Sequence, residues 1–422
     1  MTLALIIFGA TYIGLLIFPK IRAYIALASA ALFIILGIMP IRKVFFAVDW
    51  NVILMIAGTM GTVSFFIASK MPAKLADAII DKMPDVKWTI IALSVFAGVI
   101  SAFVDNVATV LMVAPIAVDI AKKLRISPVK SIIAIAIASN LEGAATLVGD
   151  TTSILLGGAA NLNFVQFFFL DGKFGMFWIV QIALIASTAV IWFIFRKDNQ
   201  PIALEDRTEV KDYFPSFLLI GTIVALILVS FIPQESKPQI INGIVCIGFF
   251  VIGAVYYLIR GNSKWITDAF REIDYFTLLL LAGLFIVIGA ITEAGVIVKI
   301  SELIVSFSGN NIFVLYTIIV WISVILSAFI DNIPYIATML PVVTGIANLM
   351  GVSPYLLYFG LLSGATLGGN LTPIGASANI AGLGILRKEG YEVKAGEFMR
   401  ISVPYTLAAV IVGYVMIWII WR

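Results

Sequence analysis

The chain has 422 residues, of which 62% are hydrophobic and only 12% are charged, and its mean hydropathy is +1.10. A soluble domain carries about 25% charged residues, so this composition excludes an ordinary soluble protein, and we expect no nucleic-acid partner. The net charge is +3, Cys246 is the single cysteine, and there is no histidine, which excludes an intrachain disulfide and the commonest zinc ligand.

Long apolar segments follow one another from the first residues to the last. We expect them at 2–18, 23–40, 51–69, 88–104, 107–121, 131–160, 175–195, 214–232, 239–259, 273–291, 312–330, 333–349, 355–385 and 399–421. Their apolar runs are continuous, which favours helices that cross about 30 Å of hydrocarbon over the alternating strands of a barrel. The predicted fold class is therefore an all-α polytopic membrane protein whose first segment is a retained helix and not a signal peptide.

An Asp-Asn pair interrupts the apolar pattern twice, in the same sequence context. "SAFVDNVATVLMVAP" runs from Ser101 to Pro115, and "SAFIDNIPYIATMLP" runs from Ser327 to Pro341. We interpret 88–121 and 312–349 as re-entrant hairpins that turn at these pairs. The remaining segments then provide about ten transmembrane helices.

Two further segments carry Gly, Ser, Thr and Asn in the middle of runs otherwise long enough to span. They are "ASNLEGAATLVGDTTS", within 131–160, and "GATLGGNLTPIGASANIAG", within 355–385. Glycines and Pro373 weaken a helix at these points. We therefore predict two broken helices, whose freed backbone groups lie beside the Asp-Asn tip of the same half.

The positive charges support this arrangement. With both hairpins re-entrant, most of the 27 lysines and arginines, Arg22 included, fall on one side, which the positive-inside rule makes cytoplasmic. The sequence then divides into a first repeat at 1–196, a cytoplasmic linker at 197–213 and a second repeat at 214–422. The two repeats have inverted topology, with both termini extracytoplasmic, and we expect the chain in the cell's inner (plasma) membrane.

The candidate substrate and ion site gathers the polar residues of these four segments. It comprises Asp105, Asn106, Asn140, Glu142, Thr146, Gly149, Asp150, Asp331, Asn332, Asn370, Thr372, Gly375, Ser377 and Asn379. An ionised carboxylate in mid-membrane costs several kcal/mol unless it is paired, hydrated or neutralised by a proton. With no basic residue close to these carboxylates in the sequence, we expect a proton or a cation there, with Na⁺ at Asp105, Asn106, Asp331 and Asn332.

Simpler roles stay open for several of these polar residues. Asp105 and Asp331 are alternatively protonated carboxyls that cap the hairpins. Thr109, Ser139 and Asn161 suit ordinary hydrogen bonds between helices equally well. Asp49 and Asp274 precede Trp50 and Tyr275, which is typical of the membrane interface.

The quoted motifs resemble those of the ion transporter superfamily, closest to its arsenical-pump and P-protein branch, with NhaD-type antiporters and citrate carriers as further members. The resemblance covers nearly the whole chain. It implies two inverted repeats, often a homodimer, and transport by an elevator movement of the hairpin-bearing domain. The chain departs from the branch pattern at Glu142, which replaces a glycine, and at Thr151–Ser153, which replaces Pro-Pro-Asn.

These features predict a secondary transporter: a proton-coupled antiporter of the arsenite-efflux or Na⁺/H⁺ type, for a small inorganic ion or a neutral oxyacid. The alternative is a Na⁺- or H⁺-coupled symporter of di- or tricarboxylates. An ion channel fits less well, because no helix carries a continuous polar stripe. An enzyme fits least, because there is no nucleophile motif. We expect membrane lipid around the protein, H⁺ or Na⁺ as the coupling ion, and no organic cofactor.

Overall fold

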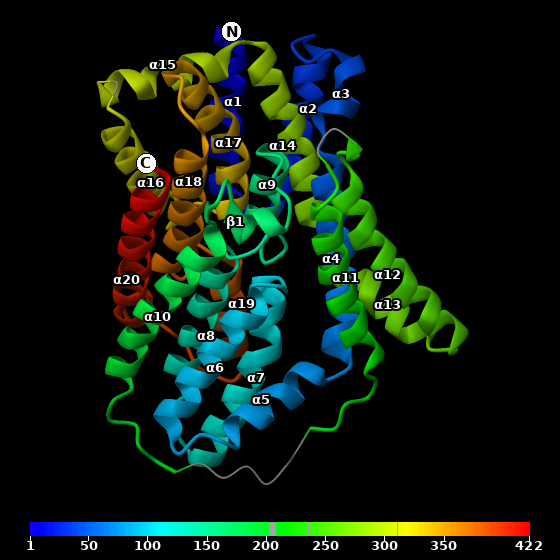
Figure 1. Cartoon of the computed structure of the whole chain (residues 1–422), viewed down its shortest axis with the longest axis vertical. Helices are drawn as coiled ribbons and strands as arrows, with labels where there is room; N and C mark the ends of the chain where they lie inside the picture. The colour runs from blue at the N-terminus through cyan, green and yellow to red at the C-terminus, as the bar shows by residue number, and fades with distance from the viewer. Residues whose placement is uncertain (202–207, 234–235, 310) are drawn as a thin grey trace.

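A computed structural model describes residues 1–201, 208–233, 236–309 and 311–422, and it is nearly all-helical (Figure 1). The helices of the first half are α1 Thr2–Ile17, α2 Arg22–Ile35, α3 Ile41–Ala47, α4 Trp50–Ala68, α5 Met71–Ile80, α6 Val86–Ser101, α7 Asn106–Leu124, α8 Val129–Glu142, α9 Thr151–Ala159 and α10 Met176–Ile194. Those of the second half are α11 Phe214–Ser230, α12 Ile241–Ile259, α13 Ser263–Glu272, α14 Tyr275–Glu293, α15 Val296–Ser308, α16 Ile312–Ser327, α17 Asn332–Met350, α18 Tyr355–Gly368, α19 Ser377–Lys388 and α20 Ala395–Trp421.

The structure departs from the predicted all-α class at one small hairpin. Strands β1 Phe169–Leu170 and β2 Lys173–Phe174 pair antiparallel between α9 and α10. Gly172, at the turn, has a φ of +74°, a conformation that glycine adopts without strain. The predicted linker at 197–213 lies partly outside the described residues, because 202–207 are not among them.

Several helices are long and apolar enough to cross a membrane. Among the described residues six qualify alone, namely α4, α10, α12, α14, α17 and α20. The count rises to eight if two bent pairs, α1 with α2 and α15 with α16, each count as one span. The expected number of about ten is not confirmed by this count: α1 and α2, predicted as separate crossings, have 16 and 14 residues and meet at a bend of 111°.

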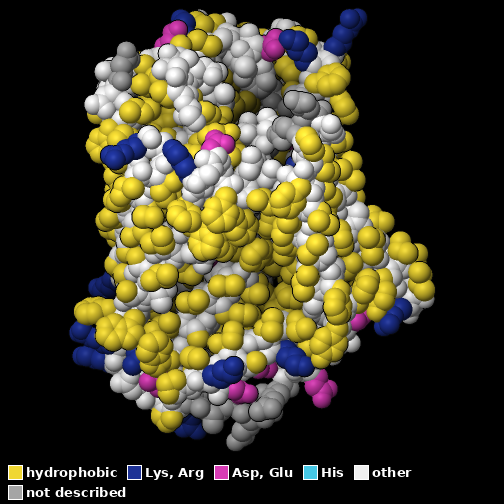
Figure 2. Space-filling view, in the orientation of Figure 1, with side chains coloured by type: hydrophobic (Ala, Val, Ile, Leu, Met, Phe, Trp, Pro, Cys, Tyr) yellow, Lys and Arg dark blue, Asp and Glu magenta, His cyan; other side chains and the backbone are white. Residues whose placement is uncertain are grey.

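The surface agrees with a membrane environment. Figure 2 shows a broad hydrophobic band, with the charged side chains gathered towards the two ends of the molecule. Large apolar side chains such as Ile35, Phe46 and Ile259 are about four-fifths exposed, which is unfavourable in water and favourable in lipid. The chain is therefore an integral membrane protein.

Helix packing divides the molecule into two parts in Figure 1. On one side α4 packs against α11, α12 and α13, and on the other α6, α7, α8, α10, α18 and α20 form a bundle. Glycines allow the closest approaches: a Cβ at Gly58 of α4 would lie 2.3 Å from the carbonyl carbon of Cys246 in α12. At Gly283 of α14 it would lie 2.8 Å from the carbonyl carbon of Ala26 in α2.

The polar interruptions lie at helix ends. Within 88–121 the chain turns between Ser101 and Asn106, and within 312–349 it turns between Ser327 and Asn332. The predicted break in 131–160 spans residues 143–150, and the one in 355–385 lies between Gly368 and Ser377. The short helices α3, α13 and α15 were not predicted, because they are amphipathic or too short to produce a long apolar run.

Candidate functional site

The two Asp-Asn pairs occupy equivalent positions at the hairpin turns. The Asp105 carboxylate accepts the backbone N–H groups of Val107 at 3.0 Å and Ala108 at 3.2 Å, so it caps the N-terminus of α7. The Asp331 carboxylate accepts the N–H of Ile333 at 3.0 Å and caps α17. The capping role left open by the sequence is thus present at both tips, and each carboxylate stabilises the positive end of a helix dipole.

Asp331 also forms an ion pair that the sequence did not reveal. The Arg22 guanidinium, at the start of α2, donates to the Asp331 carboxylate at 2.5 Å, and both side chains are 16% exposed. The expectation that no basic residue pairs with the hairpin carboxylates is therefore wrong for Asp331. The bend between α1 and α2 brings Arg22 to a carboxylate 309 positions away.

Three asparagines connect the two halves of the chain behind the tips. Asn106 Nδ2 donates to Asn140 Oδ1 at 3.0 Å, and Asn140 Nδ2 donates to Asn370 Oδ1 at 3.1 Å. Asn370 Nδ2 in turn donates to the carbonyl of Ile137 at 2.9 Å. All three asparagines are at most 4% exposed, so the network is largely buried, and it fixes α7, α8 and the second helix break relative to one another.

The loops of the broken helices lie directly against the hairpin tips. Thr146 Oγ1 donates to the carbonyl of Ala102, and Thr372 Oγ1 donates to the equivalent carbonyl of Ala328. These contacts place each loop beside the tip of its own half, as the sequence predicts. Thr146 and Thr372 therefore hold backbone in place.

Two glycines also allow the loops of the broken helices to lie this close to the hairpin tips. A Cβ at Gly149 would lie 2.9 Å from the carbonyl oxygens of Ser101 and Ala102, and a Cβ at Gly375 would lie 2.7 Å from that of Ser327. Asn379 Nδ2 bridges two carbonyls inside the second loop at 3.1 Å each. These three candidate residues shape the loops at the tips.

A pocket of about 630 Å³ lies in front of the tips, between the two parts of the molecule. Five helices begin at it: α7, α9, α14, α17 and α19 contribute residues of their first turns or caps. The wall opposite is formed by α4, α13 and the start of α14. Of the predicted site residues, those lining it are Asp105, Asn106, Asp150, Asn332 and Ser377.

The charge of this pocket is mainly negative. Its acidic lining residues are Asp105, Asp150, Asp268, Glu272 and Asp274, and Arg271 is the basic side chain among the described lining residues. Asp150 is 4% exposed, caps α9 through Thr151 N at 2.8 Å, and accepts the Thr152 hydroxyl at 2.6 Å. Residues of α13 and Asp274 were missed as pocket residues, because the sequence places Asp274 at the interface and gives no signal for α13.

Glu142 lies elsewhere. It is the last residue of α8, it is completely buried, and its Oε2 accepts Gln181 Nε2 of α10 at 2.6 Å. It does not line the pocket at the hairpin tips. The sequence grouped it with the other carboxylates because it stands in the same polar stretch, but its side chain faces away from them.

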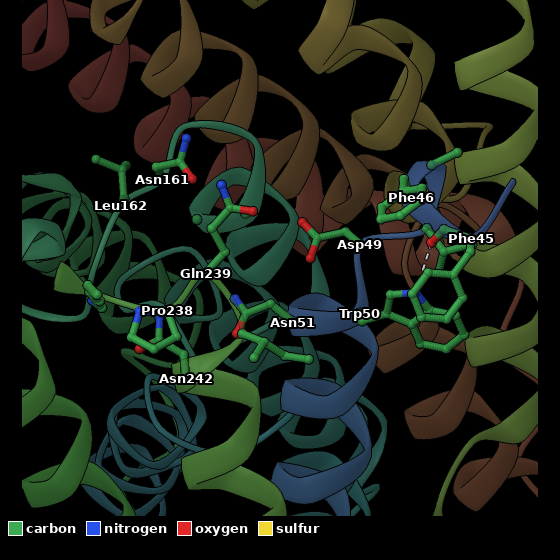
Figure 3. A pocket seen from close by; sticks show the side chains of 16 residues that line it. Phe45, Phe46, Asp49, Trp50, Asn51, Asn161, Leu162, Pro238, Gln239 and Asn242 are labelled. Atoms are coloured by element: carbon green, nitrogen blue, oxygen red, sulfur yellow. Dashed lines mark hydrogen bonds between the residues drawn. The ribbon is translucent and has the colours of Figure 1, made fainter. Parts of the chain in front are cut away.

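A second pocket, of about 740 Å³, lies at the other end of α4. Figure 3 shows Asp49, Asn161 and Gln239 around it, with Asn51, Asn242 and the Trp50–Phe45 pair at its edges. Partial burial lowers the pKa of Lys237, which also lines it. The described lining includes no residue of either hairpin tip, so the first pocket is the better candidate for the substrate site.

Three features together define a membrane transporter. They are an apolar exterior, helices interrupted in mid-bundle and a polar pocket where helix ends meet. The comparisons with known proteins agree. Residues 4–364 match the family model described as "Citrate transporter", and the chain belongs to this family, within the ion transporter superfamily that the motifs resemble.

Relatives and a solved structure extend this result. An uncharacterized transporter of Mycobacterium tuberculosis is 30% identical over 94% of each chain. The P protein of Homo sapiens is 26% identical over 77% of this chain and 48% of its own length. The crystal structure of the YdaH transporter of Alcanivorax borkumensis shares the fold with a TM-score of 0.58, at 16% identity, over 88% of this chain and 85% of that one.

Proposed function

We propose that the chain is a secondary active transporter that exchanges protons for a small cation or a neutral oxyacid, such as Na⁺ or arsenous acid. The observation that carries this proposal is the acidic pocket at the hairpin tips. Asp105 and Asp150 lie at its inner end and Asp268, Glu272 and Asp274 on the opposite wall, against Arg271. Such a field attracts cations, accepts a neutral solute and repels a polyanion.

The cation ligands we propose are Asp105 and Asn106, with Asn332 across the pocket. Carboxylate and amide oxygens suit a hard cation. In the state described here Asp331 is neutralised by Arg22, so its part in the predicted Na⁺ site requires that this ion pair separate. Separation of the pair when the pocket changes its accessible side is part of the proposal.

We also propose that the two halves are inverted repeats. The helix that begins at Trp50 corresponds to the one that begins at Tyr275, α6–α7 correspond to α16–α17, and α8–α9 correspond to α18–α19. Inversion gives two states of similar energy, each open to one side, and an elevator movement of the hairpin-bearing bundle along α4 and α14 would connect them.

The second pocket fits this scheme. It lies at Asp49 and the start of α4, just as the first pocket reaches Asp274 and the start of α14. We propose that the first pocket is the cytoplasmic vestibule, open in this state, and that the second is its extracytoplasmic counterpart, closed off from the tips. With the positive charges cytoplasmic, both termini then lie outside the inner membrane.

One observation favours the alternative of an anion symporter. Five helices begin at the first pocket, helix N-termini attract anions, and the family model is described by citrate. Four of these helices, α7, α9, α14 and α17, are capped by aspartates, whose negative charge opposes an anion. The acidic lining therefore makes the cation or neutral substrate our first choice.

Flux measurements in proteoliposomes test this choice. Uptake of Na⁺, arsenite and citrate is compared with and without an imposed pH gradient. We expect the gradient to drive Na⁺ or arsenite and to leave citrate at the level of empty liposomes. Citrate uptake that requires Na⁺ and is unaffected by the pH gradient would overturn the antiport proposal in favour of symport.

A further inference from the structure

A buried cluster behind the first hairpin is not explained by the substrate pocket. Glu142 is 0% exposed and has one hydrogen bond, from Gln181 to Oε2; its Oε1 has no partner among the described residues. Within the same described part of the chain, the hydroxyls of Tyr405 and Thr406 in α20 are also buried without a hydrogen-bond partner. The Tyr405 hydroxyl is the one of these that interacts with Glu142, so two polar atoms remain unsatisfied where α8 packs against α20.

The surroundings of Glu142 supply no positive charge. On α6, a Cβ at Gly98 would lie 2.9 Å from Glu142 Cγ, so backbone closes that side. On α10 the neighbour is the neutral Gln181, and on α20 Tyr405 is the titratable group that interacts electrostatically with Glu142. No ion pair to Glu142 occurs within the described ranges. The other titratable group near this end of α8 is Asp150, which packs against Gly143.

An ionised carboxylate sealed in this way, with one hydrogen bond and no cation, would cost too much free energy to persist. A neutral carboxylic acid fits the contacts. Its carbonyl oxygen, Oε2, accepts the hydrogen bond from Gln181. Its proton is on Oε1, the oxygen to which no described group donates a hydrogen bond. The chemistry of the cluster therefore suits one ligand, the proton.

We infer that Glu142 is a proton-binding site of the transporter and that it is separate from the substrate pocket, in the packed interface between α6, α8, α10 and α20. The inference rests on the proposed proton coupling and names the residue that carries the proton. A proton taken up from one side of the membrane protonates the carboxylate and is released on the other side, so no further reactant is needed. Proton and substrate then occupy different sites in the same moving bundle.

The proton site at Glu142 and the substrate pocket are connected by the loop of the first helix break. Gly143 follows Glu142 directly, and a Cβ at Gly143 would lie 2.8 Å from the Cβ of Asp150, which lines the substrate pocket. Ser153, on the next helix, donates to the carbonyl of Gly143 at 3.0 Å. Ionisation of Glu142 would draw polar groups towards it and shift this short segment, and the position of Asp150 would follow.

The test separates proton movement from substrate exchange in Glu142→Gln, which mimics the neutral acid. In proteoliposomes, exchange of labelled Na⁺ or arsenite at equal concentrations on both sides measures the substrate pocket, and a trapped pH dye measures proton movement. We expect Glu142→Gln to keep exchange at saturating substrate, with a lower substrate affinity that no longer depends on pH, and to lose substrate-driven proton movement. Asp119→Asn, which removes an exposed carboxylate of α7, is the matched control and should keep both.

Two further measurements test directly whether Glu142 binds the proton. Infrared difference spectra between low and high pH should show the carbonyl band of a protonated carboxyl in wild type, and that band should be missing in Glu142→Gln. Gln181→Met removes a hydrogen bond that stabilises an ionised Glu142 more than the neutral acid, so the pH profile of proton movement should shift to higher pH. Unchanged proton movement and an unchanged infrared band in Glu142→Gln would overturn the inference. A wild type that moves no protons but keeps the Glu142 band would refute the antiport and leave the proton site standing.

Discussion

The ion pair between Arg22 and Asp331 offers the sharpest test of the structure. Replacing Arg22 by Gln leaves the Asp331 carboxylate at the tip of the second hairpin with its single capping hydrogen bond, from Ile333 N. Exposed ion pairs contribute about 0.2–1 kcal/mol, whereas removing one partner of a buried pair costs about 3–5 kcal/mol. Since both side chains are only 16% exposed, we expect Arg22→Gln to lower the free energy of unfolding by about 2–4 kcal/mol.

A double-mutant cycle isolates the pair. Asp331→Asn alone leaves the guanidinium unpaired and should also destabilise, while the double variant Arg22→Gln, Asp331→Asn removes both charges and should recover part of the loss. We expect a coupling energy of about 2 kcal/mol. The assay is reversible unfolding in mixed micelles, followed by tryptophan fluorescence.

The chain contains a matched control for this cycle. Lys43 and Glu293 form a pair of similar length, 2.7 Å, but their side chains are 55% and 41% exposed. Lys43→Gln should therefore cost less than about 1 kcal/mol. Additive effects of the Arg22 and Asp331 variants, or equal losses in the Arg22 and Lys43 variants, would refute the buried pair at the hairpin tip.

Three more predictions address topology, the site and the loops. Single cysteines placed at 122–130 or 197–213, in a variant without its native cysteine, should be labelled only from the cytoplasm; labelling from outside intact cells would refute the hairpin scheme. Asp105→Asn retains an acceptor for the cap but loses the charge, so transport in proteoliposomes should fall strongly while the protein stays folded; wild-type rates would reduce it to a cap. Gly149→Ala should lower stability by about 1–3 kcal/mol, because its Cβ would meet two backbone carbonyl oxygens at 2.9 Å, whereas Gly384→Ala, with open space around it, should be neutral or better in a thermal-shift assay.

Much of the local structure follows from the sequence. The Asp-Asn pairs mark the hairpin turns because aspartate caps a helix, and the glycine-rich stretches mark the breaks because glycine weakens one. Repetition of these motifs also indicated that each loop lies beside its own tip, as the contacts of Thr146 and Thr372 show. The substrate, the coupling ion and the inverted arrangement stay predictions.

What the sequence did not reveal depends on distant parts of the chain. Arg22 reaches Asp331 only because α1 and α2 bend where they meet, and a hydropathy pattern carries no information about that angle. Glu142 belongs to the same polar stretch as Asp150, yet the end of α8 directs it to Gln181 and away from the pocket. Helix α13 lines the pocket but is too polar to appear as an apolar run.

Equilibrium binding of Na⁺ and of arsenite to the purified transporter, measured between about pH 5.5 and about pH 8.5, decides whether proton and substrate exclude one another. Because proton and substrate binding are linked reciprocally, we expect the affinity for substrate to fall as the pH falls and substrate binding to release protons. Affinities that are flat across this range, with no proton release and with binding of citrate instead, would contradict the proposed antiport.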